Sequence, residues 1–165
     1  MVPLIWGSFR MPIIRGTCAN DKPIADIVLA PVISAVGCVE GVPSFANFHM
    51  TPLRALLDTG ADGTSISTTV AQTHQLTNLG RRTVVGIGGP VMKRTWGVFV
   101  GFLFDQNTDF EGDNYHAKSV FAVPDAKLAV ELPPNGWFDV IIGRDILTMY
   151  DFYMKRGGHW ELHLS

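Results

Sequence analysis

Short apolar runs alternate with turn residues along most of the chain. The segments 24–39 and 45–57 are rich in Ile, Val, Leu, Ala and Phe and are interrupted by proline, glycine or polar residues, and a longer run spans 91–104. Runs of this length, bounded by turn-forming residues, are typical of β-strands. We therefore expect an all-β domain in which helix is a minor component.

A long hairpin is predicted in the middle of the chain. Two β-rich arms, 83–85 and 91–104, flank the segment Gly-Ile-Gly-Gly-Pro at 86–90. The simplest arrangement of these segments is a hairpin with a glycine-rich, mobile tip. The polar and acidic segment 105–114 that follows predicts a surface loop.

The C-terminal part predicts a strand, a short helix and a closing hairpin. The apolar run 138–142 is followed by Gly143 and by the segment 144–150, whose apolar residues have the spacing of one helical face. Segments 151–154 and 159–164 flank a Lys-Arg-Gly-Gly turn. Apolar and polar residues alternate in the second of these segments, as expected for a strand with one buried face.

Length and composition fit a single folded unit. The chain has 165 residues, of which 47% are hydrophobic. This is enough for one well-buried core and, by the usual size of domains, too little for two. We expect the domain to span 21–165. Residues 1–20 predict no clear element and are interpreted as an N-terminal extension, a processing remnant or an edge strand.

The first residues and the cysteines indicate the compartment. The apolar opening 1–6 has no basic lead and breaks at Gly7, well short of a signal peptide or a membrane span. Cys18 and Cys38 lack the spacing of a disulfide framework, which favours reduced thiols and leaves a bridge between them open. We expect a protein that is cytoplasmic or released from a larger precursor polyprotein, with no membrane partner.

Several ligand classes are disfavoured. The net charge is −2 and the basic residues are scattered along the sequence, so no nucleic-acid partner is expected. His159 and His163 would lie about 13 Å apart on a strand, and no cluster with metal-ligand spacing joins them. The glycines at 86–89 lack the lysine and helix of a phosphate loop. We expect neither a metal nor a cofactor.

The candidate chemistry lies in the segment Ala55-Leu-Leu-Asp-Thr-Gly-Ala-Asp-Gly-Thr-Ser65. An apolar strand delivers Asp58 into a turn, where the glycine at 60 permits close approach of another backbone. Alone, the Asp-Thr-Gly triplet is a weak signal, because three letters recur by chance and the triplet is a natural β-turn. The glycine-rich hairpin and the later segment Val140-Ile-Ile-Gly-Arg-Asp145 strengthen it.

These three segments, in this order, resemble the retropepsin family, the aspartic proteases of retroviruses and their cellular relatives. The resemblance covers residues 55–147. It implies a closed, barrel-like single lobe with a flap hairpin and one short C-terminal helix. It also implies an aspartic endopeptidase, in which Asp58 is the catalytic carboxylate, Thr59 locks its loop against the partner's loop, and Gly60 lets the substrate backbone pass.

The resemblance also assigns supporting roles. Asp62 would contact the substrate main chain and pair with Arg144, which would brace the active-site loop. The hairpin tip would close over a bound peptide. From their composition, pockets lined by residues such as Val85, Ile87 and Ile142 predict a hydrophobic cleavage preference. The residues expected to bind substrate are Ala61, Asp62, Val85, Gly86, Ile87, Gly88, Gly89 and Ile142.

A single Asp-Thr-Gly triplet predicts a homodimer. Hydrolysis by this route needs one ionised carboxylate to activate water and one protonated carboxyl to polarise the scissile carbonyl. The chain is too short for two lobes, so a second copy would supply the second Asp58. Asp139 and Asp145 lie in no such triplet and are not expected to replace it. The alternative is a catalytically silent peptide-binding or dimerisation module, against which the intact triplet argues.

Overall fold

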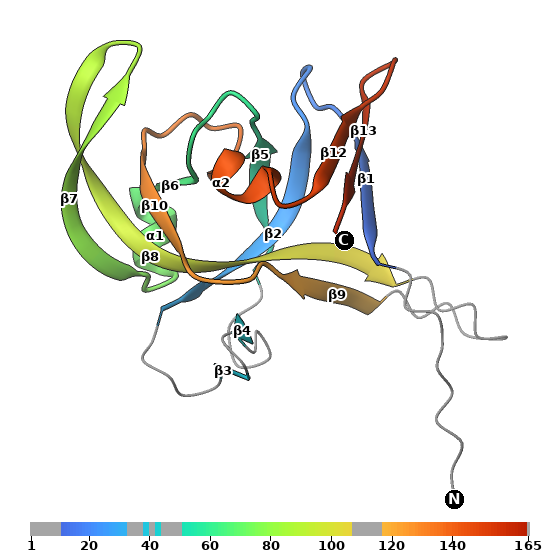
Figure 1. Cartoon of the computed structure of the whole chain (residues 1–165), viewed down its shortest axis with the longest axis horizontal. Helices are drawn as coiled ribbons and strands as arrows, with labels where there is room; N and C mark the ends of the chain where they lie inside the picture. The colour runs from blue at the N-terminus through green and yellow to red at the C-terminus, as the bar shows by residue number, and fades with distance from the viewer. Residues whose placement is uncertain (1–10, 33–37, 40–41, 44–50, 107–116, 165) are drawn as a thin grey trace, which may run out of the picture.

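The computed structural model describes residues 11–32, 38–39, 42–43, 51–106 and 117–164. It is mostly β-structure with two short helices (Figure 1). The elements in chain order are β1 (Ile13–Thr17), β2 (Ile24–Pro31), β3 (Cys38–Val39), β4 (Val42–Pro43), β5 (Leu53–Leu57), β6 (Ser65–Ser67), α1 (Thr68–Thr73), β7 (Thr77–Gly86), β8 (Gly89–Gln106), β9 (Ala117–Ala122), β10 (Lys127–Leu132), β11 (Val140–Ile142), α2 (Arg144–Leu147), β12 (Asp151–Met154) and β13 (His159–His163).

Six strands close into a ring. Around it, β10 pairs with β6, β6 with β11, β11 with β5, β5 with β2, β2 with β8, and β8 again with β10. The β10–β6 and β11–β5 pairs are parallel and the others antiparallel. Strands β7 and β9 extend from β8 outside the ring. The expected all-β lobe with a barrel-like closed sheet is therefore confirmed.

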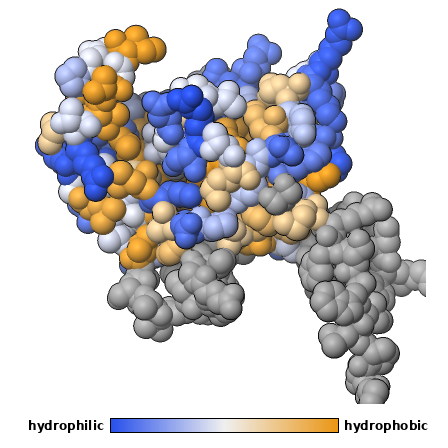
Figure 2. All heavy atoms as spheres, viewed as in Figure 1, coloured by the Kyte–Doolittle hydropathy of each residue, from blue (hydrophilic) through white to orange (hydrophobic). Residues whose placement is uncertain are grey.

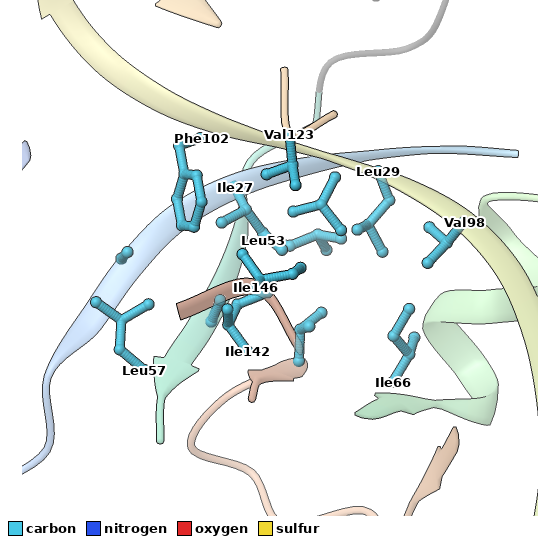
Figure 3. Packing of buried hydrophobic residues seen from close by; sticks show 14 of the residues in the cluster. Ile27, Leu29, Leu53, Leu57, Ile66, Val98, Phe102, Val123, Ile142 and Ile146 are labelled. Atoms are coloured by element: carbon cyan, nitrogen blue, oxygen red, sulfur yellow. The ribbon is translucent and has the colours of Figure 1, made fainter. Parts of the chain in front are cut away.

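The main core fills this ring. Alternate residues of β5 are buried, as in Leu53, Ala55 and Leu57, which is the period expected of a strand with one face inward. Figure 3 shows these side chains converging with those of β2, β8, β11 and α2. Each fully buried Leu or Ile stabilises the fold by about 1.5–3 kcal/mol. The labelled members are Ile27, Leu29, Leu53, Leu57, Ile66, Val98, Phe102, Val123, Ile142 and Ile146.

The predicted long hairpin is present and longer than expected. Strands β7 and β8 pair from Thr77 opposite Gly97 up to Gly86 opposite Gly89, with Ile87 and Gly88 as the turn. Gly89 has a φ of +94°, a conformation that glycine adopts without steric cost. The mobility of the tip stays a prediction. Most of the predicted surface loop 105–114 lies outside the described residues.

The C-terminal predictions are confirmed for α2 and for the β12–β13 hairpin. Trp160, Leu162 and Leu164 are buried, as their alternation predicted. Strand β13 lies between β12 and β1 in a three-stranded sheet, so that β1 is an edge strand. The Trp160 indole lies directly on β1, because a Cβ added to Gly16 would be 2.4 Å from one of its ring carbons.

Helix α1 was not predicted, whereas the expected short C-terminal helix is present as α2. The Ser67 side chain caps the first turn of α1 by accepting a hydrogen bond from the Val70 N–H at 3.2 Å. Only Val70 and Ala71 of its residues are buried, which is too short an apolar pattern to recognise. Neither described helix has the length and apolarity needed to cross a bilayer.

Strand β11 is inserted between β5 and β6, which are neighbours in sequence. It pairs parallel with β5 and antiparallel with β6. The turn that joins β5 to β6 must therefore pass over the end of β11, where Gly143 follows. A Cβ added to Gly143 would lie 2.6 Å from the backbone carbonyl carbon and oxygen of Gly63. Only glycine allows the two backbones to meet this closely.

We predict that Gly143→Ala destabilises the protein by about 1–3 kcal/mol, because the added methyl group overlaps backbone that cannot move aside without disturbing the sheet. Chemical denaturation measures the change. Gly63→Ala is the matched control on the other side of the same contact, since a Cβ there meets no atom within 4 Å. Equal effects of the two substitutions would contradict this interpretation.

A second prediction concerns Glu161 on β13. Its carboxylate lies 2.7 Å from Lys155, 2.9 Å from Arg15 and 3.3 Å from His163. Hydrogen bonds from Lys155, then Arg15, then His163, lower its pKa from 4.5 to about 2. In acid, the unfolded chain therefore takes up this proton before the folded chain does, so the stabilisation is present above pH 4.5 and is lost as the pH falls towards 2.

Thermal unfolding measured as a function of pH tests this prediction. Glu161→Gln should lower the melting temperature near neutral pH, and the difference from the unsubstituted protein should shrink as the pH approaches 2. Asp151→Asn, on the neighbouring strand β12, is the control and should leave the shape of the curve unchanged. A pH-independent effect of Glu161→Gln would show that the contribution is not electrostatic.

Candidate active site

Asp58 is the first residue after β5 and begins the turn that leads to β6. Its N–H donates to the Ile142 carbonyl at 3.0 Å, and its own carbonyl accepts from the Ala61 N–H at 3.2 Å. The Gly60 N–H donates to Asp58 Oδ1 at 2.8 Å, which fixes the direction of the carboxylate. A Cβ at residue 60 would lie only 3.1 Å from the same oxygen. Asp58 is half-buried; two hydrogen bonds fix its backbone and one fixes its carboxylate.

The floor of this turn is apolar. Leu57 and Ile142 lie side by side on the parallel strands β5 and β11 and are both buried in the core. Such packing gives Asp58 a rigid base. Ile142 was expected to line a substrate pocket. Its side chain is fully buried, so it cannot do so in the single chain. Its position beside the triplet is explained by packing.

Two backbone hydrogen bonds fasten the turn to α2. The Arg144 N–H donates to the Ala61 carbonyl at 2.8 Å, and the Asp145 N–H donates to the Asp62 carbonyl at 3.3 Å. The Arg144 guanidinium also forms an ion pair with the Asp62 carboxylate. Both side chains are largely exposed, 55% for Arg144 and 87% for Asp62, so the ion pair itself adds little stability.

A buried hydrogen bond below this ion pair was missed by sequence reasoning. Thr64 is completely buried, and its hydroxyl donates to Asp145 Oδ1 at 3.0 Å. A buried hydroxyl that lost this acceptor would cost about 1–3 kcal/mol. Thr64 is only six residues after Asp58, but nothing in its sequence context distinguishes it from an ordinary turn residue.

Neither nearby aspartate is placed to act as a second carboxylate. Asp139 lies beside Arg54: its N–H donates to the Arg54 carbonyl at 2.8 Å, and its Oδ2 accepts from the Arg54 N–H at 3.1 Å. Arg54 precedes Asp58 by four residues of extended chain, so their Cα atoms are about 13 Å apart. Asp145 is occupied by Thr64. Two carboxyls that share a proton must be in contact, so neither can form a dyad with Asp58.

The hairpin tip lies apart from the Asp58 turn within one chain. Ile87 is fully exposed and Val85 is 78% exposed. A Cβ added to Gly86, Gly88 or Gly89 would meet no atom within 4 Å. Figure 1 shows the hairpin projecting beyond the ring, away from α2. The structure therefore gathers residues 58–62 and Arg144 into one site. Within this site Thr59 is exposed, and the predicted tip residues lie apart from it without a contact that fixes their roles.

Comparison with solved structures finds the protease of EIAV in complex with the inhibitor HBY-793. The two chains are 20% identical, and the match covers 77% of this chain and 86% of that one with a TM-score of 0.43. No curated protein matches the chain.

A family comparison bears directly on the Asp58 turn. Residues 41–102 match the model described as aspartyl protease, and this range holds β5, the turn, β6, α1 and most of the β7–β8 hairpin. The match includes both the triplet and the glycine-rich tip that were singled out by their chemistry. The segment of the chain that carries its Asp-Thr-Gly turn is thus similar to aspartyl proteases.

Proposed function

We propose that the protein is an aspartic endopeptidase that works as a homodimer. The observation that carries the proposal is the Asp58 turn: its carboxylate is half-buried, aimed by the Gly60 N–H and supported by an apolar floor. Asp139 and Asp145 are engaged by Arg54 and Thr64 instead. The second carboxylate is Asp58 of another copy, related by a two-fold axis.

In this dimer the two Asp58 side chains hold one proton between them, because two adjacent carboxylates cannot both be ionised. The ionised carboxylate takes a proton from a water molecule, which attacks the scissile carbonyl carbon. The protonated one donates its proton to the carbonyl oxygen, which gives a tetrahedral diol. The carboxyl that took the proton from water then gives it to the amide nitrogen as the C–N bond breaks, and one hydroxyl of the diol returns a proton to the other carboxylate as the new carboxylic acid forms. The two roles can exchange because the subunits are identical. Exposed Thr59 is available to bond the partner's turn, and Gly60 leaves space for the substrate backbone.

The substrate is an extended polypeptide segment lying between the Asp58 pair and the two hairpin tips. The glycines at the tip supply unhindered backbone groups for β-type hydrogen bonds with such a segment. The exposed side chains of Val85 and Ile87 provide apolar surface next to it. This supports a preference for hydrophobic residues beside the cleaved bond. Asp62 and Arg144 brace the turn, and no cofactor takes part.

A peptide-binding module without catalysis is the second candidate. It would use the same turn and the same hairpin, and the exposed apolar tip would serve it equally well. The aimed carboxylate of Asp58 favours catalysis, since binding a peptide backbone does not require an acid at this position.

We predict that Asp58→Asn abolishes cleavage of a denatured protein, lowering the rate by about 10²- to 10⁴-fold, because the amide can neither activate water nor donate the proton. Asp139→Asn is the matched control: its amide oxygen can still accept from the Arg54 N–H, and it should retain activity. Inhibition by a pepstatin-type inhibitor should accompany the activity. If Asp58→Asn cleaves as fast as the unsubstituted protein, the proposed function is wrong.

A further inference from the structure

The β7–β8 hairpin assembles four cations that are scattered in the sequence. Arg81 lies directly opposite Arg94, and Arg82 lies directly opposite Lys93. We refer to these four residues as the basic collar. The expectation that basic residues are scattered holds along the chain but not in space, because strand pairing brings two separated dipeptides together at the base of the hairpin.

This arrangement is unfavourable for the hairpin itself. Side chains of like charge directly opposite each other on antiparallel strands repel and destabilise the pair. Across the described part of the chain, no acidic side chain forms an ion pair with any member of the collar. Two adjacent repulsive pairs are therefore retained without an internal counter-charge of equal size.

Glu131 on β10 is the acidic neighbour, and it compensates only in part. Its Oε2 accepts from the Arg94 N–H at 3.2 Å and its Oε1 accepts from the Thr68 hydroxyl at 2.9 Å. These hydrogen bonds lower its pKa, and the charges of Arg94 and Lys93 add to the effect. The hairpin carries four cations, two on each of its faces, and Glu131 is a single carboxylate, which leaves an excess of positive charge.

For the collar to act on a substrate, a bound polypeptide must run along the hairpin from its tip towards the collar. Arg82 is five residues before Ile87 at the tip, which is about 16 Å along a strand. An extended peptide advances by a similar length per residue, so residues outside the cleaved segment come level with the collar. Figure 2 shows hydrophilic residues gathered on the arm of the hairpin beneath an apolar tip. The hairpin thus offers apolar contact at its tip and positive charge at its base.

We propose that the basic collar selects polypeptide substrates that carry Asp or Glu in the segments flanking the hydrophobic cleavage site. The proposal rests on the proposed function for the placement of the substrate. An acidic flank supplies the counter-charge that the hairpin lacks, so binding relieves the repulsion between Arg82 and Lys93 as well as adding attraction. A nucleic acid is the weaker match, because the chain is net acidic and the collar is confined to one hairpin.

The test compares three peptides that share one cleavable core and carry Glu, Gln or Lys in both flanks. At low salt, kcat/KM for the Glu peptide should exceed that for the Gln peptide by about two- to tenfold, the size expected of a few exposed charge pairs. The double variant Arg82→Gln with Lys93→Gln should bring the ratio close to one. The reversed variant Arg82→Glu with Lys93→Glu should prefer the Lys peptide, which a misfolded hairpin would not do.

The matched control is Lys118→Gln with Arg156→Gln, which makes the same change in net charge. Lys118 is on β9 and Arg156 is in the β12–β13 turn, on the other side of the molecule from β7 (Figure 1). This control should keep the preference for the Glu peptide. High salt should remove the preference in every variant, since exposed charges are screened beyond about 10 Å at 0.1 M salt.

Binding of the same labelled peptides to the Asp58→Asn variant, measured by fluorescence anisotropy, separates this proposal from the proposed function. Preferential binding of the Glu peptide without cleavage by the unsubstituted protein would support the collar and refute catalysis. Equal binding and cleavage of all three peptides would overturn the collar and leave catalysis standing. A labelled single-stranded nucleic acid that binds through the collar while the peptides are not distinguished would also overturn it.

Discussion

The contact between the backbones of Gly143 and Gly63 is the constraint on which the candidate site depends. Strand β11 can lie between β5 and β6 only if the turn joining them passes over its end, and the absence of a side chain at Gly143 lets the two backbone segments touch there. Once this crossing is made, the Asp58 N–H meets the Ile142 carbonyl and the Arg144 N–H meets the Ala61 carbonyl. The contact between these backbone segments thus fixes the turn that carries the Asp58 carboxylate.

Around the turn, the interaction between charged side chains contributes less to stability than a buried hydrogen bond does. The Asp62–Arg144 ion pair is the most visible feature, but exposed pairs contribute only about 0–1 kcal/mol. The buried Thr64 hydroxyl and its bond to Asp145 weigh more, because an unsatisfied buried group costs about 1–3 kcal/mol. The ion pair is therefore better understood as orienting the turn and α2 than as holding them together.

Sequence patterns predicted the parts of the structure in which local chemistry and tertiary packing agree. Asp58 follows an apolar strand, the glycine-rich tip falls between two β-rich arms, and Trp160, Leu162 and Leu164 alternate with polar residues; in each case the pattern and the environment coincide. Helix α1 was missed because its buried face is only Val70 and Ala71. Ile142 was assigned to a substrate pocket from composition alone. Its position in the motif does not indicate which way its side chain packs, and in the structure it is buried.

The remaining differences arise from pairing between distant segments, which a single sequence does not encode locally. The return of β10 to β8 closes the ring, and the register of β7 on β8 sets Arg82 against Lys93. Neither can be derived from periodicity. The same register determines the charge on the hairpin, so the feature that we propose to select substrates emerged only in three dimensions.

The central claim is that two copies of Asp58 form one catalytic pair. It is tested most directly by refolding the unsubstituted chain together with the Asp58→Asn chain at a fixed total concentration and measuring peptide cleavage. If two carboxylates are required, random pairing predicts activity that follows the square of the fraction of unsubstituted chain. Activity that falls in simple proportion to that fraction would show that each chain acts alone and would contradict the account.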